Sequence, residues 1–291
     1  TSDTNETSET TAPNATSDPS GTHPAPDVPA DATARRDPPA LDPTNPWRLI
    51  GDPPLPATRR LFCIPHAGAT AMAFQPWRGH IPPGLEVRAA QLPGRWTDRG
   101  PAISDLDRLV AGLLADLAPL LDRPFALFGA SMGGLLAFEL ARALQRAGGP
   151  QPTHLVVVGA AAPDGVHPLL ARSPGLRDAL AGPGDLAALT RLGLIPEAQL
   201  SPDLLALVLP ALRADLELVL RHQHQPGPAL ACPISALCGS ADDIVGRHDS
   251  AGWVAHTTGD FTLQRVEGGH LFYRDDPAAT WRALARLSPP R

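Results

Sequence analysis

The stretch Phe128–Arg142, FGASMGGLLAFELAR, decides how this chain of 291 residues is interpreted. It contains a G-x-S-x-G pattern, in which Ser131 stands between Gly129 and Gly133. The apolar FALF before the pattern predicts a strand, and the helical spacing of apolar residues after it predicts a helix. A serine at so sharp a strand-to-helix turn needs small neighbours, because no larger side chain fits beside the turn. The stretch therefore predicts a nucleophile at Ser131.

Two other functions of glycine-rich loops do not fit GASMGG. A dinucleotide-binding fingerprint needs glycines at G-x-G-x-x-G spacing, which this segment does not provide. A phosphate-binding loop needs a lysine followed by serine or threonine, whereas Leu135 and Leu136 follow the glycines here.

Apolar segments alternate with helical patterns along residues 46–291. Six segments have the length and composition of strands: 60–64, 85–91, 125–128, 154–158, 234–238 and 261–266. Helical spacing of apolar residues is present at 106–121, 132–146 and 277–287. Strands separated by helices predict an α/β fold, with a mostly parallel central sheet and helices on both faces.

Residues 165 to about 228 interrupt this alternation, because they contain no good strand. Amphipathic helical stretches are present instead at 186–192 and 203–220. Open α/β sheets bind ligands at the carboxyl ends of their strands. We therefore expect a helical lid over that edge of the sheet.

The first 45 residues are rich in Thr, Ser, Pro, Asp and Ala and have almost no large apolar side chains. Such a segment cannot bury enough apolar surface to offset the entropy lost on ordering. We expect residues 1–45 to be a disordered tail.

The charge and the apolar pattern of the chain argue against a nucleic-acid-binding, a membrane-spanning or a secreted protein. The net charge is −6 and no long basic run is present, so nucleic acid is not an expected partner. No segment has the roughly 20 uninterrupted apolar residues of a membrane span. The N-terminus lacks the pattern of a secretory signal, so a cytoplasmic location is expected.

A serine nucleophile needs a histidine base, and the histidine needs a carboxylate to orient it. In this class of fold the chain order is serine, acid, histidine. His270 follows the last predicted strand, after two glycines. Asp242 follows the strand at 234–238 and is the expected acid, with its neighbour Asp243 and the earlier Asp164 as alternatives.

The tetrahedral intermediate of acyl transfer needs two backbone N–H donors. One is expected from Met132, the residue after the nucleophile. The other is expected from the small-residue loop after the first predicted strand, where Ala67 is favoured over Gly68. We interpret His66, in the same loop, as a structural residue.

Six stretches resemble the type II thioesterases, the stand-alone editing hydrolases of polyketide synthases and nonribosomal peptide synthetases. In the family's order they are FCIPHAG at 62–68, QLPGR at 91–95, GASMGG at 129–134, LPALRADL at 209–216, CPISALCGSADD at 232–243 and EGGHLFY at 267–273. A generic lipase or peptidase has no reason to carry QLPGR or LPALRADL. The resemblance covers residues 47–288 and implies an α/β-hydrolase fold.

The resemblance implies an acyl thioester substrate, carried on the phosphopantetheine arm of an acyl carrier or peptidyl carrier protein. Its hydrolysis would regenerate a stalled or misprimed synthase, and it needs no metal or organic cofactor. The family's triad falls on Ser131, Asp242 and His270, and its oxyanion donors fall on Ala67 and Met132. A general carboxylesterase, an acyltransferase and a non-catalytic acyl-carrier-binding protein are the competing hypotheses.

Three positions need separate mention. Ala130 stands where the family usually has histidine, which leaves the turn sterically allowed but removes a polar neighbour. Arg95 and Arg213 could contact an acidic carrier protein or its phosphate, but a structural role is the favoured interpretation of each. Arg213 lies close to Asp215 in the same helical segment, which suggests an ion pair.

Overall fold

The computed structural model describes residues 45–51, 56–95, 100–172, 190 and 201–285. The chain divides into two units, Thr1–Asp42 and Pro43–Arg291, and all described residues belong to the second. Residues 1–44 of the segment expected to be disordered lie outside the described residues. Among the described residues, no helix is long and apolar enough to cross a membrane.

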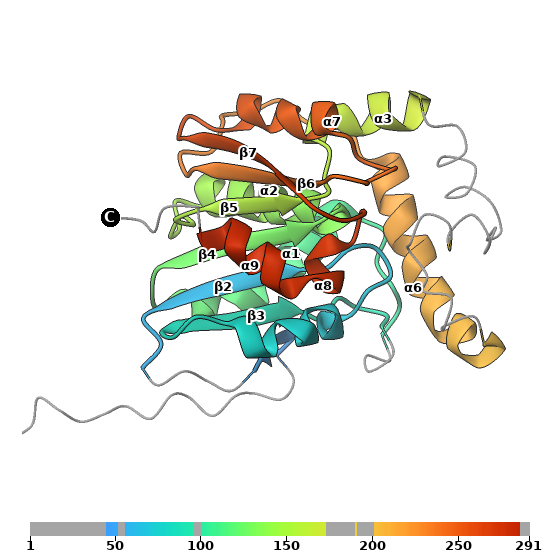
Figure 1. Ribbon diagram of the computed structural model, residues 1–291, viewed down its shortest axis with the longest axis horizontal. Coiled ribbons are helices and arrows are strands. Elements are labelled where there is room, and N and C mark those ends of the chain that lie inside the picture. Colours follow the sequence, from blue (N-terminus) through green and yellow to red (C-terminus); the bar gives the residue numbers. More distant parts are fainter. Residues whose placement is uncertain (1–44, 52–55, 96–99, 173–189, 191–200, 286–291) are drawn as a thin grey trace, which may run out of the picture. The chain divides into compact units, whose positions relative to one another are not determined.

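A seven-stranded sheet forms the centre of the second unit (Figure 1). Its strands are β1 (Trp47–Ile50), β2 (Arg59–Ile64), β3 (Leu85–Ala90), β4 (Phe125–Ala130), β5 (Leu155–Val158), β6 (Ile234–Gly239) and β7 (Phe261–Val266). The strand order is β1-β3-β2-β4-β5-β6-β7, and only the β1–β3 pair is antiparallel. The predicted α/β-hydrolase fold with a mostly parallel sheet is confirmed.

The six predicted strands are all present, with ends that differ by at most two residues. β4 runs two residues further than predicted, to Ala130, so the strand continues up to Ser131. The short edge strand β1 was not predicted, because four residues give too little alternation to recognise. Its Trp47 is buried and packs edge-on against Phe62 of β2.

Helices cover both faces of the sheet. The α-helices are α1 (Leu106–Leu117), α2 (Met132–Arg146), α3 (Val166–Arg172), α6 (Pro202–Arg221), α7 (Arg247–Ala251), α8 (Phe272–Asp275) and α9 (Pro277–Ala285). The 3₁₀ helices are η1 (Ala71–His80), η2 (Ala118–Leu120), η3 (Pro163–Gly165) and η5 (Gly252–His256). α1 stops short of the predicted end at residue 121, because Pro119 has no N–H to continue the α-helical ladder.

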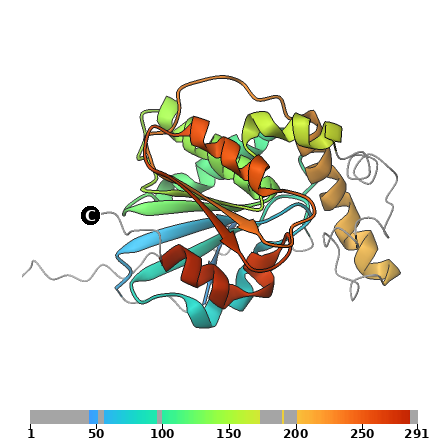
Figure 2. The same ribbon diagram turned by 45° about the horizontal axis from the view of Figure 1, so that its top comes forward.

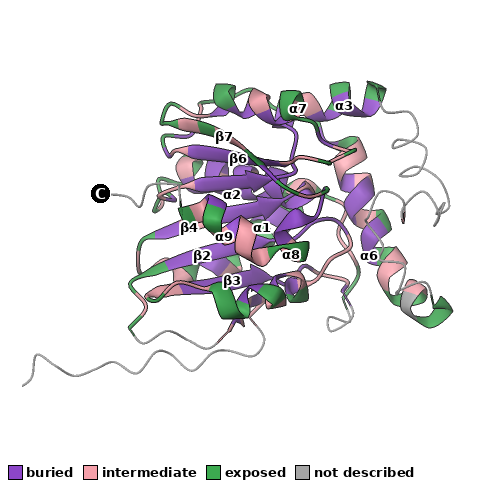
Figure 3. Cartoon of the chain, viewed as in Figure 1, coloured by how far each residue is buried: buried purple, intermediate pink, exposed green. Residues whose placement is uncertain are grey.

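The alternation of side chains along each strand separates two apolar layers. Phe62 and Ile64 of β2 face α1 and α2, whereas Leu61 and Cys63 face the layer formed by η1, α8 and α9. Both layers are fully buried, as Figure 3 shows for the central strands. A sheet buried on both faces explains why its strands are apolar without strict alternation.

The predicted lid segment, 165–228, is described only in part. It contains α3 and α6, and α6 matches the predicted helix at 203–220 within two residues. The predicted helix at 186–192 lies outside the described residues, apart from Thr190. α6 lies beyond the carboxyl ends of the parallel strands, where β4 meets α2 (Figures 1 and 2).

Candidate active site

Ser131 occupies a strained turn between β4 and α2. Its backbone angles are φ 53° and ψ −120°, and among the described residues it alone has a positive φ without being glycine. Its N–H donates to the carbonyl of Val158 (2.8 Å), and its own carbonyl accepts from the N–H of Gly134 (2.8 Å). Such a conformation costs on the order of 1–3 kcal/mol and persists only where its surroundings enforce it. These bonds tie the turn to β5 on one side and to the start of α2 on the other.

The two glycines that flank Ser131 are required by close backbone contacts. A Cβ atom on Gly129 would lie 2.1 Å from the carbonyl oxygen of Gly133. A Cβ atom on Gly133 would lie 2.2 Å from the carbonyl oxygen of Ile64. Because backbone atoms cannot move aside as a flexible side chain does, the turn, helix α2 and strand β2 can approach this closely only with glycine at both positions.

Ala130 is the last residue of β4 and directly precedes the serine. It is 1% exposed and belongs to the apolar layer between the sheet and η1, α8 and α9. A buried imidazole at this position would need a hydrogen-bond partner, whereas a methyl group needs none. The departure from the family's usual histidine therefore fits an apolar environment.

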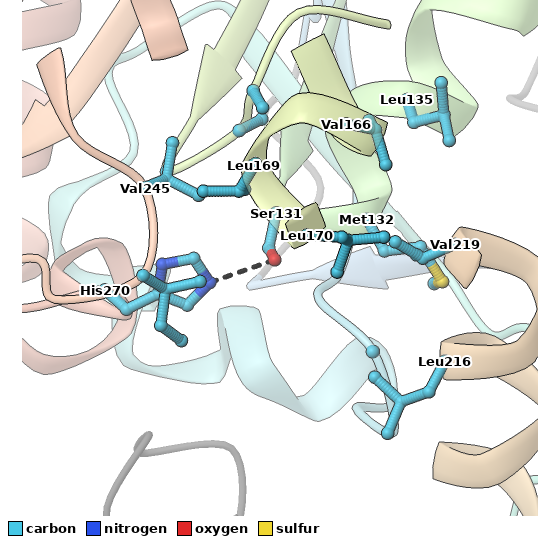
Figure 4. A pocket seen from close by; sticks show the side chains of 15 residues that line it. Ser131, Met132, Leu135, Val166, Leu169, Leu170, Leu216, Val219, Val245 and His270 are labelled. Carbon is cyan, nitrogen blue, oxygen red and sulfur yellow. Dashed lines mark hydrogen bonds between the residues drawn. The ribbon is translucent and has the colours of Figure 1, made fainter. Parts of the chain in front are cut away.

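Three side chains form a continuous hydrogen-bonded relay (Figure 4 shows its first link). The Nε2 of His270 lies 2.9 Å from the Oγ of Ser131, and its Nδ1 lies 2.9 Å from the Oδ2 of Asp242. The Oδ1 of Asp242 also accepts the backbone N–H groups of Ile244 and Val245, each at 2.9 Å. A carboxylate fixed in this way holds the Nδ1–H of the imidazole and turns Nε2 toward the hydroxyl as a proton acceptor.

Glycines bring the histidine loop to the relay. β6 and β7 pair in parallel, so the loops that follow them leave the same edge of the sheet. Gly268 has φ 125°, and a Cβ there would lie 2.8 Å from the Cβ of Phe272. A Cβ on Gly239 would lie 2.5 Å from the carbonyl oxygen of Gly269. The acid loop and the histidine loop can therefore approach closely enough for Asp242 to reach His270.

The other two candidate acids lie elsewhere. The Oδ1 of Asp164 is 2.9 Å from the Nε2 of His256, so this carboxylate pairs with a different histidine. Asp243 is exposed, whereas the side chain of its neighbour Asp242 is fully buried. Of the three acids, the structure brings only Asp242 to His270.

His66 holds the loop after β2 from one side. Its Nδ1 lies 2.7 Å from the hydroxyl oxygen of Tyr273, and both side chains are buried. Burial, with Arg274 and His270 nearby, lowers the pKa of His66 to about 3, so its ring is neutral at physiological pH. Burial also raises the pKa of the Tyr273 hydroxyl. The pair is a neutral hydrogen bond with a structural role.

Ala67 and Met132, the expected oxyanion donors, both line the cavity that contains Ser131. The N–H of Gly68, the alternative donor, instead points to a carboxylate, because it donates to the Oδ2 of Asp215 (2.7 Å). The geometry therefore favours Ala67 over Gly68 as the donor from this loop.

The partner of Asp215 differs from the one that the sequence suggested. Asp215 pairs with Arg95, and the two side chains are 0% and 1% exposed. Arg213 is exposed on the same helix, because residues two apart on an α-helix point in different directions. The buried Arg95 also cannot present its guanidinium to a carrier protein. Burial raises the pKa of Asp215, while Arg95 and the N–H of Gly68 act in the opposite direction.

A cavity of about 80 Å³ opens beside the Ser131 hydroxyl (Figure 4). Apart from Ser131 and His270, the described residues that line it are apolar or glycine. They come from α2, α3, α6 and the loops after β2, β5 and β6, and Figure 4 labels Leu170, Leu216 and Val219 among them. The site combines a hydroxyl, a base and an apolar chamber. Within the described residues, no group of three or more His, Cys, Asp or Glu could hold a metal ion.

Comparisons with known proteins agree with this chemistry. A family model described as "Thioesterase domain" matches residues 59–286. Thioesterase PikA5 of Streptomyces venezuelae is 35% identical over 219 residues, which are 74% of this chain and 76% of that protein. The solved structure of RedJ, a thioesterase from the prodiginine biosynthetic pathway in Streptomyces coelicolor, has a TM-score of 0.71 and 34% identity, covering 82% of this chain and 87% of RedJ. The type II thioesterase BorB from the borrelidin biosynthetic cluster has a TM-score of 0.68 and 33% identity, covering 82% of this chain and 96% of BorB.

The contact between Gly133 and β2 predicts a large stability difference between two Gly→Ala variants. Gly133→Ala should lower the free energy of unfolding by at least about 2 kcal/mol, because its Cβ would lie 2.2 Å from a backbone oxygen. Gly112→Ala, in α1, has nothing within 4 Å of the new Cβ and should raise stability by up to about 1 kcal/mol. Urea unfolding measures both values, and equal stabilities would contradict the close contact.

The low pKa of His66 predicts a pH dependence of stability. The unfolded chain takes up a proton near pH 6.5, but the folded protein does so only near pH 3, so this contribution is complete above pH 6.5 and is lost as the pH falls. His66→Gln should therefore reduce the slope of unfolding free energy against pH, between pH 6 and 4, by about 1.4 kcal/mol per pH unit. Denaturant unfolding at several pH values measures the slope, with the exposed His248→Gln as control. An unchanged slope in His66→Gln would mean that His66 titrates normally.

Proposed function

Because this chain belongs to the thioesterase family and is a thioester hydrolase, we propose that it releases acyl groups from the phosphopantetheine arm of carrier proteins through Ser131, His270 and Asp242. The observation that carries this proposal is the unbroken relay from Ser131 to Asp242 beside an apolar cavity. A relay of this kind activates a serine for attack on an acyl carbon.

In the first step, the Oγ of Ser131 attacks the thioester carbonyl carbon as the Nε2 of His270 takes the hydroxyl proton. The backbone N–H groups of Ala67 and Met132 hold the oxyanion of the tetrahedral intermediate. Collapse of the intermediate breaks the C–S bond, and the pantetheine sulfur leaves with the proton from His270. The buried Asp242 stabilises the imidazolium while it carries that proton.

In the second step, water hydrolyses the acyl-enzyme. His270 takes a proton from the water, whose oxygen attacks the ester carbonyl, and the same two N–H groups hold the second oxyanion. When the ester C–O bond breaks, His270 returns the proton to the Oγ of Ser131. The products are a carboxylic acid and the regenerated enzyme, and the carrier keeps a free thiol.

The cavity supports an apolar acyl group as the substrate. Leu216 and Val219 of α6 and Leu169 and Leu170 of α3 present only hydrocarbon to it. We assign these helices to a lid that encloses the acyl chain. RedJ comes from the prodiginine biosynthetic pathway, and the type II thioesterase BorB comes from the borrelidin biosynthetic cluster. By this similarity the partner is an acyl or peptidyl carrier protein, and the role is removal of acyl groups that stall or misprime a synthase.

A carboxylesterase or an acyltransferase could use the same relay. A thiolate is a better leaving group than an alkoxide, so a thioesterase needs less protonation of the leaving atom. Oxygen esters and thioesters of the same acid therefore separate a thioesterase from a carboxylesterase, and release of the free acid separates a thioesterase from an acyltransferase.

A substrate panel tests the proposal directly. Acetyl to octanoyl groups on phosphopantetheinylated carrier protein and on N-acetylcysteamine should be hydrolysed with higher kcat/KM than the matching ethyl esters. Ser131→Ala should lower kcat by about 10³- to 10⁶-fold, because no acyl-enzyme forms. Faster turnover of the oxygen esters would overturn the thioesterase assignment, and unchanged activity of Ser131→Ala would exclude this serine.

The two neighbouring aspartates form a matched pair for testing the acid. Asp242→Asn should lower kcat by about 10⁴-fold, because an amide cannot hold the imidazole in the tautomer that accepts the serine proton. Asp243→Asn, at an exposed position, should change kcat less than threefold, which is about 0.6 kcal/mol. Steady-state kinetics measure both variants, and a reversed order of the two losses would assign the acid to Asp243.

A further inference from the structure

Three sequence motifs, two of which the catalytic steps do not use, meet at one buried carboxylate. Asp215 comes from LPALRADL in α6, Arg95 from QLPGR after β3, and Gly68 from the PHAG loop after β2. These segments lie far apart in the chain, yet their polar groups share one oxygen atom of Asp215.

Asp215 receives two donors in a site closed to solvent. Its Oδ2 accepts the N–H of Gly68 at 2.7 Å and also bonds the Nη2 of Arg95. Arg95 further donates to the carbonyl oxygens of Pro93 (2.8 Å) and Ala69 (3.3 Å). The carboxylate therefore anchors the loop after β2 both directly and through the guanidinium.

Helix α6 also contacts this loop through an apolar side chain. Gly68 has φ 76°, and a Cβ there would lie 3.1 Å from the Cβ of Leu212, one turn before Asp215. Gly68 therefore contacts α6 twice, through its backbone packing against Leu212 and through its N–H bond to Asp215. The neighbouring Leu216 and Val219 line the acyl cavity. Helix α6 therefore lines the acyl cavity and also contacts the loop after β2.

The residue before Ala67 is held from the other side. His66 bonds the hydroxyl of Tyr273, whose ring packs among aromatic side chains of η1 and β4. Ala67 is therefore flanked by two anchored residues, His66 and Gly68. Its N–H therefore lies in a segment that is hydrogen-bonded on both sides.

We propose that Asp215 is a positioning residue, which keeps the N–H of Ala67 aimed at the reacting carbonyl oxygen by accepting the N–H of Gly68. Helix α6 thereby links the wall of the acyl chamber to the oxyanion site. This inference rests on the proposed function, because it assigns a role within the same acyl transfer. Asp215 touches no reacting atom and takes no proton in the reaction.

The expected effect is selective for the transition state. Preorganised donors act mainly on charge that develops during reaction, and a misplacement of about 1 Å costs up to roughly 100-fold in rate. Loss of the Asp215 anchor should therefore lower kcat with little change in binding of the unreacted thioester. A residue that only stabilised the fold would not separate these two quantities.

Two double variants test this without leaving a buried charge unpaired. Arg95→Met with Asp215→Leu removes both charges and the acceptor for Gly68, and apolar replacement of a buried ion pair is commonly tolerated. Arg95→Gln with Asp215→Asn also removes both charges but keeps an amide oxygen that can accept the N–H of Gly68. The two variants differ chiefly in that acceptor.

The probes are butyryl-N-acetylcysteamine, its non-hydrolysable thioether and its trifluoromethyl ketone analogue. The ketone adds the Oγ of Ser131 to its carbonyl carbon, His270 takes the hydroxyl proton, and the resulting oxyanion occupies the oxyanion site. The thioether binds without reacting and reports ground-state affinity. The ratio of the two affinities isolates the oxyanion interaction.

We expect Arg95→Met with Asp215→Leu to lose about 10- to 100-fold in kcat and in ketone affinity, with thioether affinity within twofold of wild type. Arg95→Gln with Asp215→Asn should lose less. If the first double variant loses 100-fold, the second should have at least tenfold higher kcat and ketone affinity than the first. Each of three results would overturn the proposal. They are equal losses of ketone affinity in the two double variants, equal losses of ketone and thioether affinity in Arg95→Met with Asp215→Leu, and wild-type ketone affinity in that same variant.

Thermal unfolding establishes whether each variant is folded. If Arg95→Met with Asp215→Leu does not fold, Arg95→Gln with Asp215→Ser replaces it. The serine hydroxyl is one atom shorter than the carboxylate, so it does not reach the N–H of Gly68. The same criteria then apply to that variant. If wild type fails to hydrolyse the thioester, the proposed function itself fails. If wild type is active and the variants match it, only the role of Asp215 is refuted.

Discussion

The close approach of three backbone segments around Ser131 is the constraint on which the rest of the site depends. Strand β4, helix α2 and the end of β2 meet so closely that glycine is needed at positions 129 and 133. That packing forces Ser131 to a positive φ, and the strain points its hydroxyl out of the turn, toward His270. The apolar layers on both faces of the sheet hold the segments together and so stabilise the strained turn.

Two buried networks lie at the carboxyl edge of the sheet, and the first of them starts at this turn. One joins Ser131 through His270 to Asp242 and ends on backbone N–H groups of the acid loop. The other joins Gly68 through Asp215 to Arg95 and ends on carbonyl groups of two loops. Each places a charged group out of solvent and supplies it with hydrogen-bond partners, as a buried charge requires. In the mechanism that we propose, the first network transfers the proton and the second positions the loop after β2.

Sequence reasoning was most successful where a local pattern has one physical explanation. The strand–turn–helix pattern around Ser131 placed β4 and α2 correctly, and the chain order of serine, acid and histidine named side chains that the structure brings together. It was wrong about the partner of Asp215, because Arg95 is 120 residues away and only the fold brings it near. Edge strand β1 was missed for a related reason, because four residues do not show a strand pattern and its pairing with β3 depends on the fold.

The sequence by itself determined most of the local conformations: six of the seven strands to within two residues, where glycine permits tight turns, and which residue types can carry a proton. These follow from nearest-neighbour sterics and from the period of apolar residues. Only the tertiary structure decided which carboxylate faces which histidine, and that Asp164 pairs with His256 while Asp242 pairs with His270. It also decided that Arg95 is buried against Asp215 while Arg213 is exposed. Such choices depend on distances between residues far apart in the chain, which are set when the whole sheet and its helices pack.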